Sequence, residues 1–133
     1  MCIRDRYIEQ TQNDLFADRQ LRLMIENGNR QVVGIVDLCS FDPLHNRAEV
    51  GIMVDKSCRR QGIGRNALAL LEEHCFRYLG IHQLFAYIAV ENLPSRRLFA
   101  ACGYKESAVL KEWAHTFGGG YTDVLVVQKL NLS

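Results

Sequence analysis

The hydrophobic positions of this chain recur with two different periods, and each period predicts one type of element. Across Ala48–Val54 apolar and polar residues alternate, which is the period of a strand with one buried face. Across Ile63–Tyr78 the apolar residues recur every three or four positions, which predicts an amphipathic helix, and Gly80 supplies its C-terminal stop. The chain therefore passes from a strand to a helix through residues 55–62.

The segments before this strand predict a helix followed by a hairpin. Tyr7–Ala17 has helical spacing, and Gln20–Glu26 alternates like a strand. Residues 27–29 read Asn-Gly-Asn, a turn sequence, because asparagine and glycine tolerate positive φ. We therefore expect Gln31–Cys39 to pair antiparallel with the strand before it.

The second half of the chain predicts a parallel crossover and a closing hairpin. The helix that begins at Ile63 must return the chain to a buried strand at Leu84–Val90, which gives a right-handed crossover between parallel neighbours. A short helix is expected at about Pro94–Cys102. Tyr104–Leu110 and Tyr121–Leu130 are expected to form a hairpin around a long loop.

Composition and charge narrow the class of protein. A chain of 133 residues, 48% hydrophobic and 23% charged, fits one globular domain, and a net charge of +1 gives no sign of nucleic-acid or membrane binding. The five cysteines are odd in number and form no C-x-x-C pair, which argues against a disulfide framework and a metal site. No apolar run reaches the roughly 20 residues of a membrane span, and Met1–Arg6 is not followed by the apolar core of a signal peptide. A cytoplasmic location is the simplest expectation.

A basic turn containing two glycines joins the strand to the long helix. It reads Arg59-Arg60-Gln61-Gly62-Ile63-Gly64-Arg65. Glycines in a first helical turn let a ligand approach the main chain, and the unpaired amides and the helix dipole favour an anion there. The arginines add donors that suit phosphate oxygens. The turn therefore predicts a pyrophosphate site, against the alternative of an ordinary solvated helix start.

Two motifs carry a resemblance to a known family. Arg59-x-x-Gly62-x-Gly64 resembles the Arg/Gln-x-x-Gly-x-Gly/Ala signature of the GNAT acyltransferases, whose loop amides hold the pyrophosphate of acetyl-CoA. Asn92-x-x-Ser95-x-x-Leu98-Phe99-x-x-x-Gly103-Tyr104 is similar to the family's Asn-x-x-Ser/Ala-x-x-Leu-Tyr-x-x-x-Gly-Phe element. The resemblance covers residues 7–130 and is nearest to the branch of spermidine and ribosomal-protein acetyltransferases.

The resemblance implies an α/β (α+β) fold in a single domain over residues 1–133. Its central sheet is mixed and mostly antiparallel, with flanking helices and one parallel β-α-β crossover. Relatives begin with a strand and a helix ahead of the helix expected at Tyr7–Ala17, so we expect an N-terminal truncation, with residues 1–6 foreign to the domain or disordered. The strand at Gln20–Glu26 is then an uncovered edge, which favours association into a homo-oligomer.

The resemblance also implies acetyl-CoA as cosubstrate and assigns residues to it. In the family the end of the strand pairs with the pantetheine arm, the basic turn holds the pyrophosphate, and the later short helix lies near the thiol end. The residues expected to bind the cofactor are Ile52, Met53, Val54, Arg59, Arg60, Gln61, Gly62, Ile63, Gly64, Arg65, Asn92, Ser95 and Phe99. Asn92 also fits an ordinary helix cap with Pro94 in the first turn, and both interpretations can hold together.

Amine acetylation needs a base for the ammonium and a proton for the leaving thiolate. Some family members use a glutamate at the position of Glu49 as a base acting through water, so Glu49 is the leading candidate, against plain solvent exposure on a strand. Phe99 stands where many members have a tyrosine that acts as the general acid for the CoA thiolate, and phenylalanine has no proton to give. Tyr104 and Tyr121 are conceivable substitutes, although Tyr104 matches a core position. His115, in the expected loop, is a weaker candidate.

The implied function is transfer of an acetyl group from acetyl-CoA to a primary amine, by direct attack. The acceptor is a small-molecule amine or polyamine, or a protein N-terminus. A non-catalytic CoA-binding or truncated, inactive fragment stays open as an alternative. Gly62–Ala67 also satisfies the G-x-G-x-x-A pattern of dinucleotide-binding oxidoreductases. Against that alternative, seven residues separate Val54 from Gly62, whereas a Rossmann turn leaves its strand abruptly.

Overall fold

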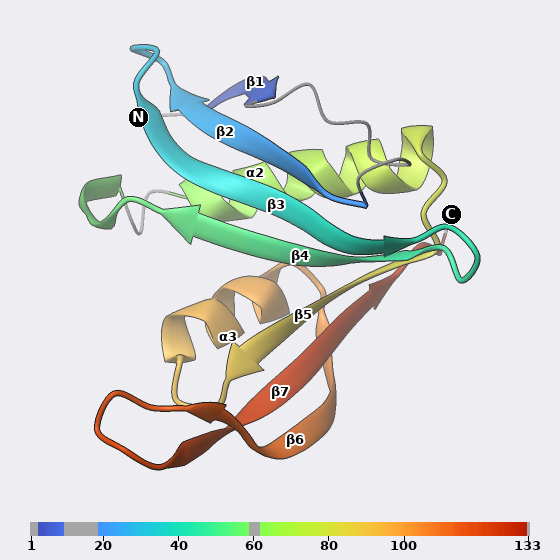
Figure 1. The fold of residues 1–133 in the computed structure, drawn as a ribbon. Coiled ribbons are helices and arrows are strands. Elements are labelled where there is room, and N and C mark those ends of the chain that lie inside the picture. Colours follow the sequence, from blue (N-terminus) through green and yellow to red (C-terminus); the bar gives the residue numbers. More distant parts are fainter. Residues whose placement is uncertain (1–2, 10–18, 59–61, 133) are drawn as a thin grey trace.

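The computed structural model describes residues 3–9, 19–58 and 62–132. Within these ranges the strands form one seven-stranded sheet in the order β1-β2-β3-β4-β5-β7-β6 (Figure 1). The strands are β1 Ile3–Glu9, β2 Leu21–Asn27, β3 Val32–Asp42, β4 Arg47–Val54, β5 Gln83–Ala89, β6 Lys105–His115 and β7 Tyr121–Leu130. The helices are α2 Ile63–Glu73, extended by a π-helical turn at His74–Tyr78, α3 Leu93–Ala101 and a short 3-10 turn at Lys56–Cys58.

Every pair of neighbouring strands in this sheet is antiparallel except β4 and β5. Helix α2 connects those two strands, as the sequence predicts for a parallel crossover. The mostly antiparallel sheet with one parallel pair is therefore confirmed. Gly80 adopts a φ of 66° where the long helix ends, which agrees with its expected role as a stop.

The predicted β2–β3 hairpin is confirmed, and its turn is built by one side chain. The Asn27 side-chain oxygen accepts hydrogen bonds from the backbone N–H groups of Asn29 at 2.8 Å and Gln31 at 3.0 Å. Asn27 is only 2% exposed, so these bonds satisfy a buried carbonyl oxygen. The turn therefore fixes the register of β2 on β3.

The core lies between one face of the sheet and the two helices. Alternate residues of β4 and β5 are buried on this face, and α2 and α3 contribute the opposing side chains (Figure 1). The buried residues of these four elements are Ala48, Val50, Leu84, Ala86, Ile88, Ile63, Ala67, Leu68, Leu71 and Phe99. No helix in the described part of the chain is long and apolar enough to cross a membrane.

The expected helix at Tyr7–Ala17 is wrong at its start. Residues 7–9 belong to β1, where Tyr7 pairs with Ile25 and Glu9 pairs with Leu23; residues 10–17 lie outside the described residues. Residues 3–6, which we expected to be foreign to the domain or disordered, form the first half of β1. We expected the edge of β2 to be uncovered, but β1 pairs with it. The free N–H and C=O groups of an edge strand are a template on which another strand can pair.

The loop expected after Leu110 is also wrong, since β6 continues to His115. The register of β6 on β7 shifts between Leu110 and Ala114, which marks a bulge. Within it Glu112 has a φ of 48°, and its N–H donates to the Asp123 carboxylate at 2.8 Å. The actual turn is short and spans residues 116–120.

A largely buried ion pair connects α2 to β7. The Lys129 ammonium donates to Glu72 Oε1 at 2.6 Å and to the Cys102 carbonyl oxygen at 2.6 Å. The Glu72 side chain is 8% exposed and that of Lys129 is 30% exposed. The Tyr104 ring lies against this group, with the Lys129 Nζ 5.9 Å from its centroid. The pair therefore holds the C-terminal half of α2 against strand β7.

We expect Lys129→Met to lower the free energy of unfolding by about 3 kcal/mol, because it leaves the buried Glu72 carboxylate without its cation. Urea denaturation followed by circular dichroism measures the change. Lys111→Met is the matched control, since Lys111 is 80% exposed and its 3.2 Å contact with Asp123 is a surface ion pair, worth at most about 1 kcal/mol. Equal losses from the two substitutions would contradict a structural role for the buried pair.

Candidate cofactor-binding and catalytic site

The parallel strands β4 and β5 stay together over three residue pairs and then separate. Their ladder ends at the pair Glu49–Phe85. Beyond it β4 continues on β3 as far as Val54, and β5 continues on β7 as far as Ala89. Figure 1 shows the two arrowheads pointing apart. Alternate residues of a strand direct their N–H and C=O groups to opposite edges. Within residues 51–53, β4 therefore presents main-chain groups on the edge that is no longer paired with β5.

Helix α2 begins beside this separation with a glycine in the left-handed conformation. Gly62 is the N-cap, with φ 76° and ψ 4°, and no described side chain caps the helix. A Cβ at Gly62 would meet no atom of the described residues within 4 Å, and its φ of 76° is one that glycine adopts without strain. The first turn carries no acidic residue, and Arg65 is exposed. This end of the helix therefore fits an anion.

Gly64 brings three elements of the predicted site together. A Cβ at this position would lie 3.2 Å from Leu98 Cδ2 of α3 and 3.7 Å from Val54 Cγ2 of β4. The neighbouring Ile63 is 1% exposed and anchors the first turn in the core. The start of α2, the end of β4 and helix α3 are therefore packed at one place.

Helix α3 begins with the cap that its sequence predicts. The Asn92 side-chain oxygen accepts a hydrogen bond from the Ser95 N–H at 3.3 Å, and Pro94 lies in the first turn. Asn92 is exposed and Ser95 is half-buried. Phe99 lies deeper, 4% exposed, with its ring edge-to-face against Tyr104 at a centroid distance of 4.9 Å. Its side chain is thus part of the core.

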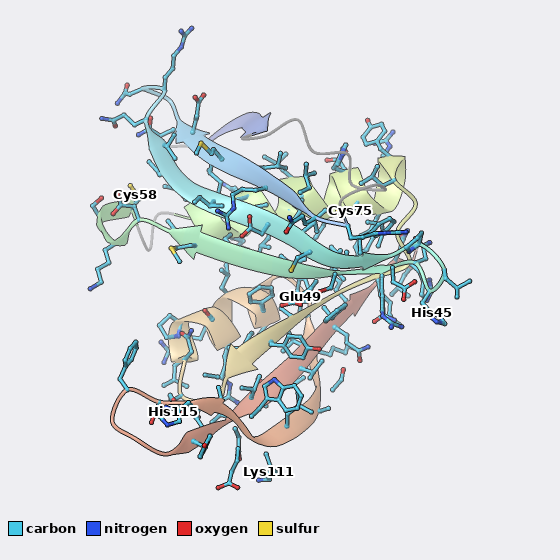
Figure 2. All side chains as sticks on the ribbon, in the orientation of Figure 1. His45, Glu49, Cys58, Cys75, Lys111 and His115 are labelled. Carbon is cyan, nitrogen blue, oxygen red and sulfur yellow. The ribbon has the colours of Figure 1, made fainter. Side chains whose placement is uncertain are left out.

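Glu49 lies at the point where the strands separate. It pairs in register with Cys39 of β3 and Phe85 of β5, and it is half-exposed (Figure 2). Burial raises the pKa of the Cys39 thiol, and the adjacent Glu49 carboxylate raises that pKa further. Cys39 is therefore a neutral S–H neighbour of the carboxylate. Among the described residues Glu49 has no ion-pair partner.

Comparison with known proteins decides the family. A family model described as an acetyltransferase (GNAT) domain matches residues 4–105. The chain belongs to the GNAT acetyltransferase family. Both motifs, at residues 59–64 and 92–104, lie within the matched range.

Two curated relatives of this GNAT chain are acetyltransferases of bacteria. Spermidine N(1)-acetyltransferase of Vibrio cholerae is 27% identical over 103 residues, covering 77% of this chain and 59% of that protein. A putative phosphinothricin acetyltransferase of Bacillus subtilis is 34% identical over 102 residues, covering 72% of this chain and 59% of that protein. This chain thus spans about three-fifths of the length of both relatives.

Solved structures show the same fold. A chimera built from Vibrio cholerae spermidine N-acetyltransferase has a TM-score of 0.83 at 25% identity, covering 88% of this chain and 70% of that chain. The dodecameric Vibrio cholerae spermidine N-acetyltransferase has a TM-score of 0.81 at 25% identity, covering 88% of this chain and 68% of that chain. The GNAT fold of the described elements is therefore confirmed.

The structure separates the other candidate residues from Glu49. Tyr104 is 4% exposed, and burial followed by the Glu72 carboxylate raises its pKa far above the usual range, which confirms the core interpretation. Tyr121 is 63% exposed and contacts the His115 ring at 5.1 Å. Figure 2 places His115 at the far end of the β6–β7 hairpin, away from Glu49.

Part of the predicted set cannot be placed. Arg59, Arg60 and Gln61 lie outside the described residues. The end of β4 at Val54, the first turn of α2 at Gly64 and the middle of α3 at Leu98 are brought together, while Phe99 is buried in the core. Within the described ranges no cluster of three or more His, Cys, Asp or Glu side chains is arranged to hold a metal ion.

Sequence reasoning missed the neighbours of Glu49. Cys39 and Phe85 flank it through the sheet register, and Tyr87 follows Phe85 on the same face. The run from Leu84 to Val90 is apolar throughout, which predicts a buried strand, whereas Tyr87 within it is exposed. The signal that was present is the alternation of aromatic residues with smaller aliphatic ones along β5.

We expect Gly34→Ala to destabilise the domain by about 2 kcal/mol, since overpacking against main chain forces a backbone shift. A Cβ at Gly34 would lie 2.6 Å from the Met53 carbonyl oxygen, at the end of β4 that borders the site. Urea denaturation measures the loss. Gly51→Ala is the control, because its Cβ would meet only Asp37 Cβ at 3.9 Å. A Gly34 variant as stable as the control would show that β3 and β4 do not approach as closely as described.

Proposed function

We propose that this GNAT domain transfers an acetyl group from acetyl-CoA to a primary amine by direct attack. The observation that carries the proposal is the separation of β4 and β5 beside the glycine-capped start of α2. An exposed main-chain edge next to a helix N-terminus suits an extended ligand that carries phosphate groups. Membership of the GNAT family and the acetyltransferase relatives support it.

The residues fit acetyl-CoA in three places. The main chain of residues 52–54 would pair with the pantetheine arm, and the amides of residues 62–65 would bind the pyrophosphate, with Arg59, Arg60 and Gln61 completing the basic turn. Asn92, Ser95 and Phe99 would border the thiol end through helix α3. The open space at Gly62 and the exposed Arg65 support this assignment. When bound, acetyl-CoA supplies the activated acetyl group.

Glu49 is the base in this proposal. Its carboxylate is half-exposed, stands where the two strands part, and is available to take a proton from an amine directly or through one water. Phe99 has no ionisable proton, and the Tyr104 hydroxyl is buried with a strongly raised pKa. We therefore assign proton removal to Glu49 and no general acid to the described side chains near it.

The acceptor is proposed to be a small-molecule amine. Relatives are named for spermidine and, putatively, phosphinothricin, both of which carry amines. A protein N-terminus is the remaining acceptor class. A homo-oligomer is also proposed, supported by the dodecameric state of a Vibrio cholerae relative.

One alternative function is favoured by a specific observation. Because the family tyrosine is replaced by a core phenylalanine at position 99, the domain could bind CoA without catalysing transfer. The dinucleotide-binding alternative is overturned, since antiparallel neighbours flank β4 and β5 on their outer sides and the family model is that of an acetyltransferase.

We expect calorimetric titration to show micromolar binding of acetyl-CoA and none of NAD. The pyrophosphate site and the separated strand edge both contribute to the first ligand, whereas NAD has no pantetheine arm to pair with β4. Absence of acetyl-CoA binding by the folded protein would overturn the cofactor assignment.

We expect Glu49→Gln to lower the rate of amine acetylation about a hundredfold, the usual contribution of a general base. The acetyl-CoA Kd should stay unchanged, because Glu49 is not among the cofactor-binding residues. Glu73→Gln is the matched control, since Glu73 lies on the exposed face of α2 in a surface pair with Arg77 at 3.4 Å. A wild-type domain that binds acetyl-CoA but acetylates no amine would establish the non-catalytic alternative.

A further inference from the structure

Strand β5 exposes two aromatic rings on the face that its core residues do not use. Leu84, Ala86 and Ile88 are 0%, 2% and 4% exposed and face the helices. Phe85 and Tyr87 alternate with them, and Tyr87 is 46% exposed. Their rings meet edge-to-face at a centroid distance of 5.8 Å and an interplanar angle of 83°. The core therefore does not account for these two rings.

The aromatic pair begins at Glu49 and continues past the point where β4 departs. Phe85 is the register partner of Glu49 in the last pair of the parallel ladder. Tyr87 is two residues further along, a step of roughly 6.6 Å at the usual rise of a strand. Glu49 lies on the neighbouring strand, roughly 4.8 Å to the side, so two cation-attracting groups, a carboxylate and a ring face, are at least about 8 Å apart at the main chain. An extended four-carbon diamine can span this separation once the contact distances at its two ends are added.

The β4 side of this edge is kept open by a glycine. Gly51 follows Glu49 on the same face, and it would pair with Tyr87 if the ladder continued in the same register. A Cβ at Gly51 would meet only the Cβ of Asp37, at 3.9 Å. Residue 51 therefore leaves room beside Tyr87 that a larger side chain would take.

The charge at this edge is negative and comes from Glu49. The nearby Asp37 is balanced by a two-point ion pair, with Arg22 Nε 2.8 Å from Oδ1 and Nη2 3.1 Å from Oδ2. Cys39 is held neutral by its raised pKa. Within the described residues no cation pairs with Glu49. Such an edge attracts a cationic ligand.

We infer that Glu49, Gly51, Phe85 and Tyr87 form an acceptor edge that selects linear diamines, and that Tyr87 and Gly51 are its specificity-determining residues. The reacting amine lies at Glu49, the carbon chain lies along Phe85 in the room left by Gly51, and the distal ammonium lies over the Tyr87 ring. The inference rests on the proposed function, because Glu49 is the base there.

The test compares 1,4-diaminobutane with 4-amino-1-butanol, which replaces the distal ammonium by a hydroxyl. Ligand-observed NMR titration in the presence of CoA gives the Kd of each amine. We expect the diamine to bind about tenfold more tightly, the size of a partly desolvated cation–π contact. Tyr87→Leu should remove that preference and leave the Kd of the amino alcohol unchanged. Gly51→Val should weaken both amines, and Tyr87→Leu should leave the Kd of acetyl-CoA unchanged.

Matched controls are Tyr78→Leu, which removes an exposed ring on the helical turn after α2, and Gly118→Val, which adds the same side chain in open space. Both should bind the two amines as the wild type does. A diamine preference that survives Tyr87→Leu, or that the wild type lacks, overturns the inference. Binding needs no turnover, so a Tyr87-dependent preference without acetylation supports the edge while the transferase proposal fails. If the wild type acetylates the diamine and Tyr87→Leu leaves that rate unchanged, the transferase proposal stands and the acceptor edge is overturned.

Discussion

The short parallel ladder between β4 and β5 is the constraint on which the rest of the site depends. Each of these strands is committed to an antiparallel neighbour along its length, β4 to β3 and β5 to β7. Beyond the last parallel pair each strand stays paired with its antiparallel neighbour alone, so the two antiparallel units diverge from that point. The ladder stops at Glu49 and Phe85, and the open main-chain edge and the exposed Tyr87 ring lie beyond that point.

Helix α2 has to span the two parts of the sheet that this separation creates. Its first turn is packed between β4 and α3, through the close approach of Gly64 to Leu98 and Val54. Its last turn is held to β7 by the Glu72–Lys129 pair. A buried ion pair contributes less to stability than an apolar contact of the same size, but removing one partner is costly, so it disfavours other placements of the helix. The position of the helix N-terminus beside β4 thus depends on contacts at both ends of α2.

The elements that could be predicted from the sequence are those with a local signal. The Asn-Gly-Asn turn and the glycine stop after the long helix fixed the β2–β3 hairpin and the crossover. The wrong predictions concern segments whose structure depends on contacts with strands distant in the sequence. The charged run at residues 4–6 has no strand alternation, yet it lies within β1, where the flanking residues Ile3 and Tyr7 pair with β2. The bulge at Glu112 is hydrogen-bonded to Asp123, eleven residues away. The exposed face of β5 differs from the buried face only in carrying aromatic in place of aliphatic residues, a weak signal in a run that is apolar throughout.

The chemistry of the acceptor explains why a site with a base and without an acid is reasonable. An alkylammonium has a pKa of about 10.4, so at neutral pH it must lose a proton before its nitrogen can attack. A thiol has a pKa of about 8.5 and leaves as its anion with less assistance. In the proposed reaction the deprotonation step therefore places the larger demand on the protein, and Glu49, the proposed base, lies at the last pair of the parallel ladder. Position 99 carries a phenylalanine, whose ring packs against Tyr104. A tyrosine there would add a hydroxyl group, which in that core would need a hydrogen-bond partner of its own.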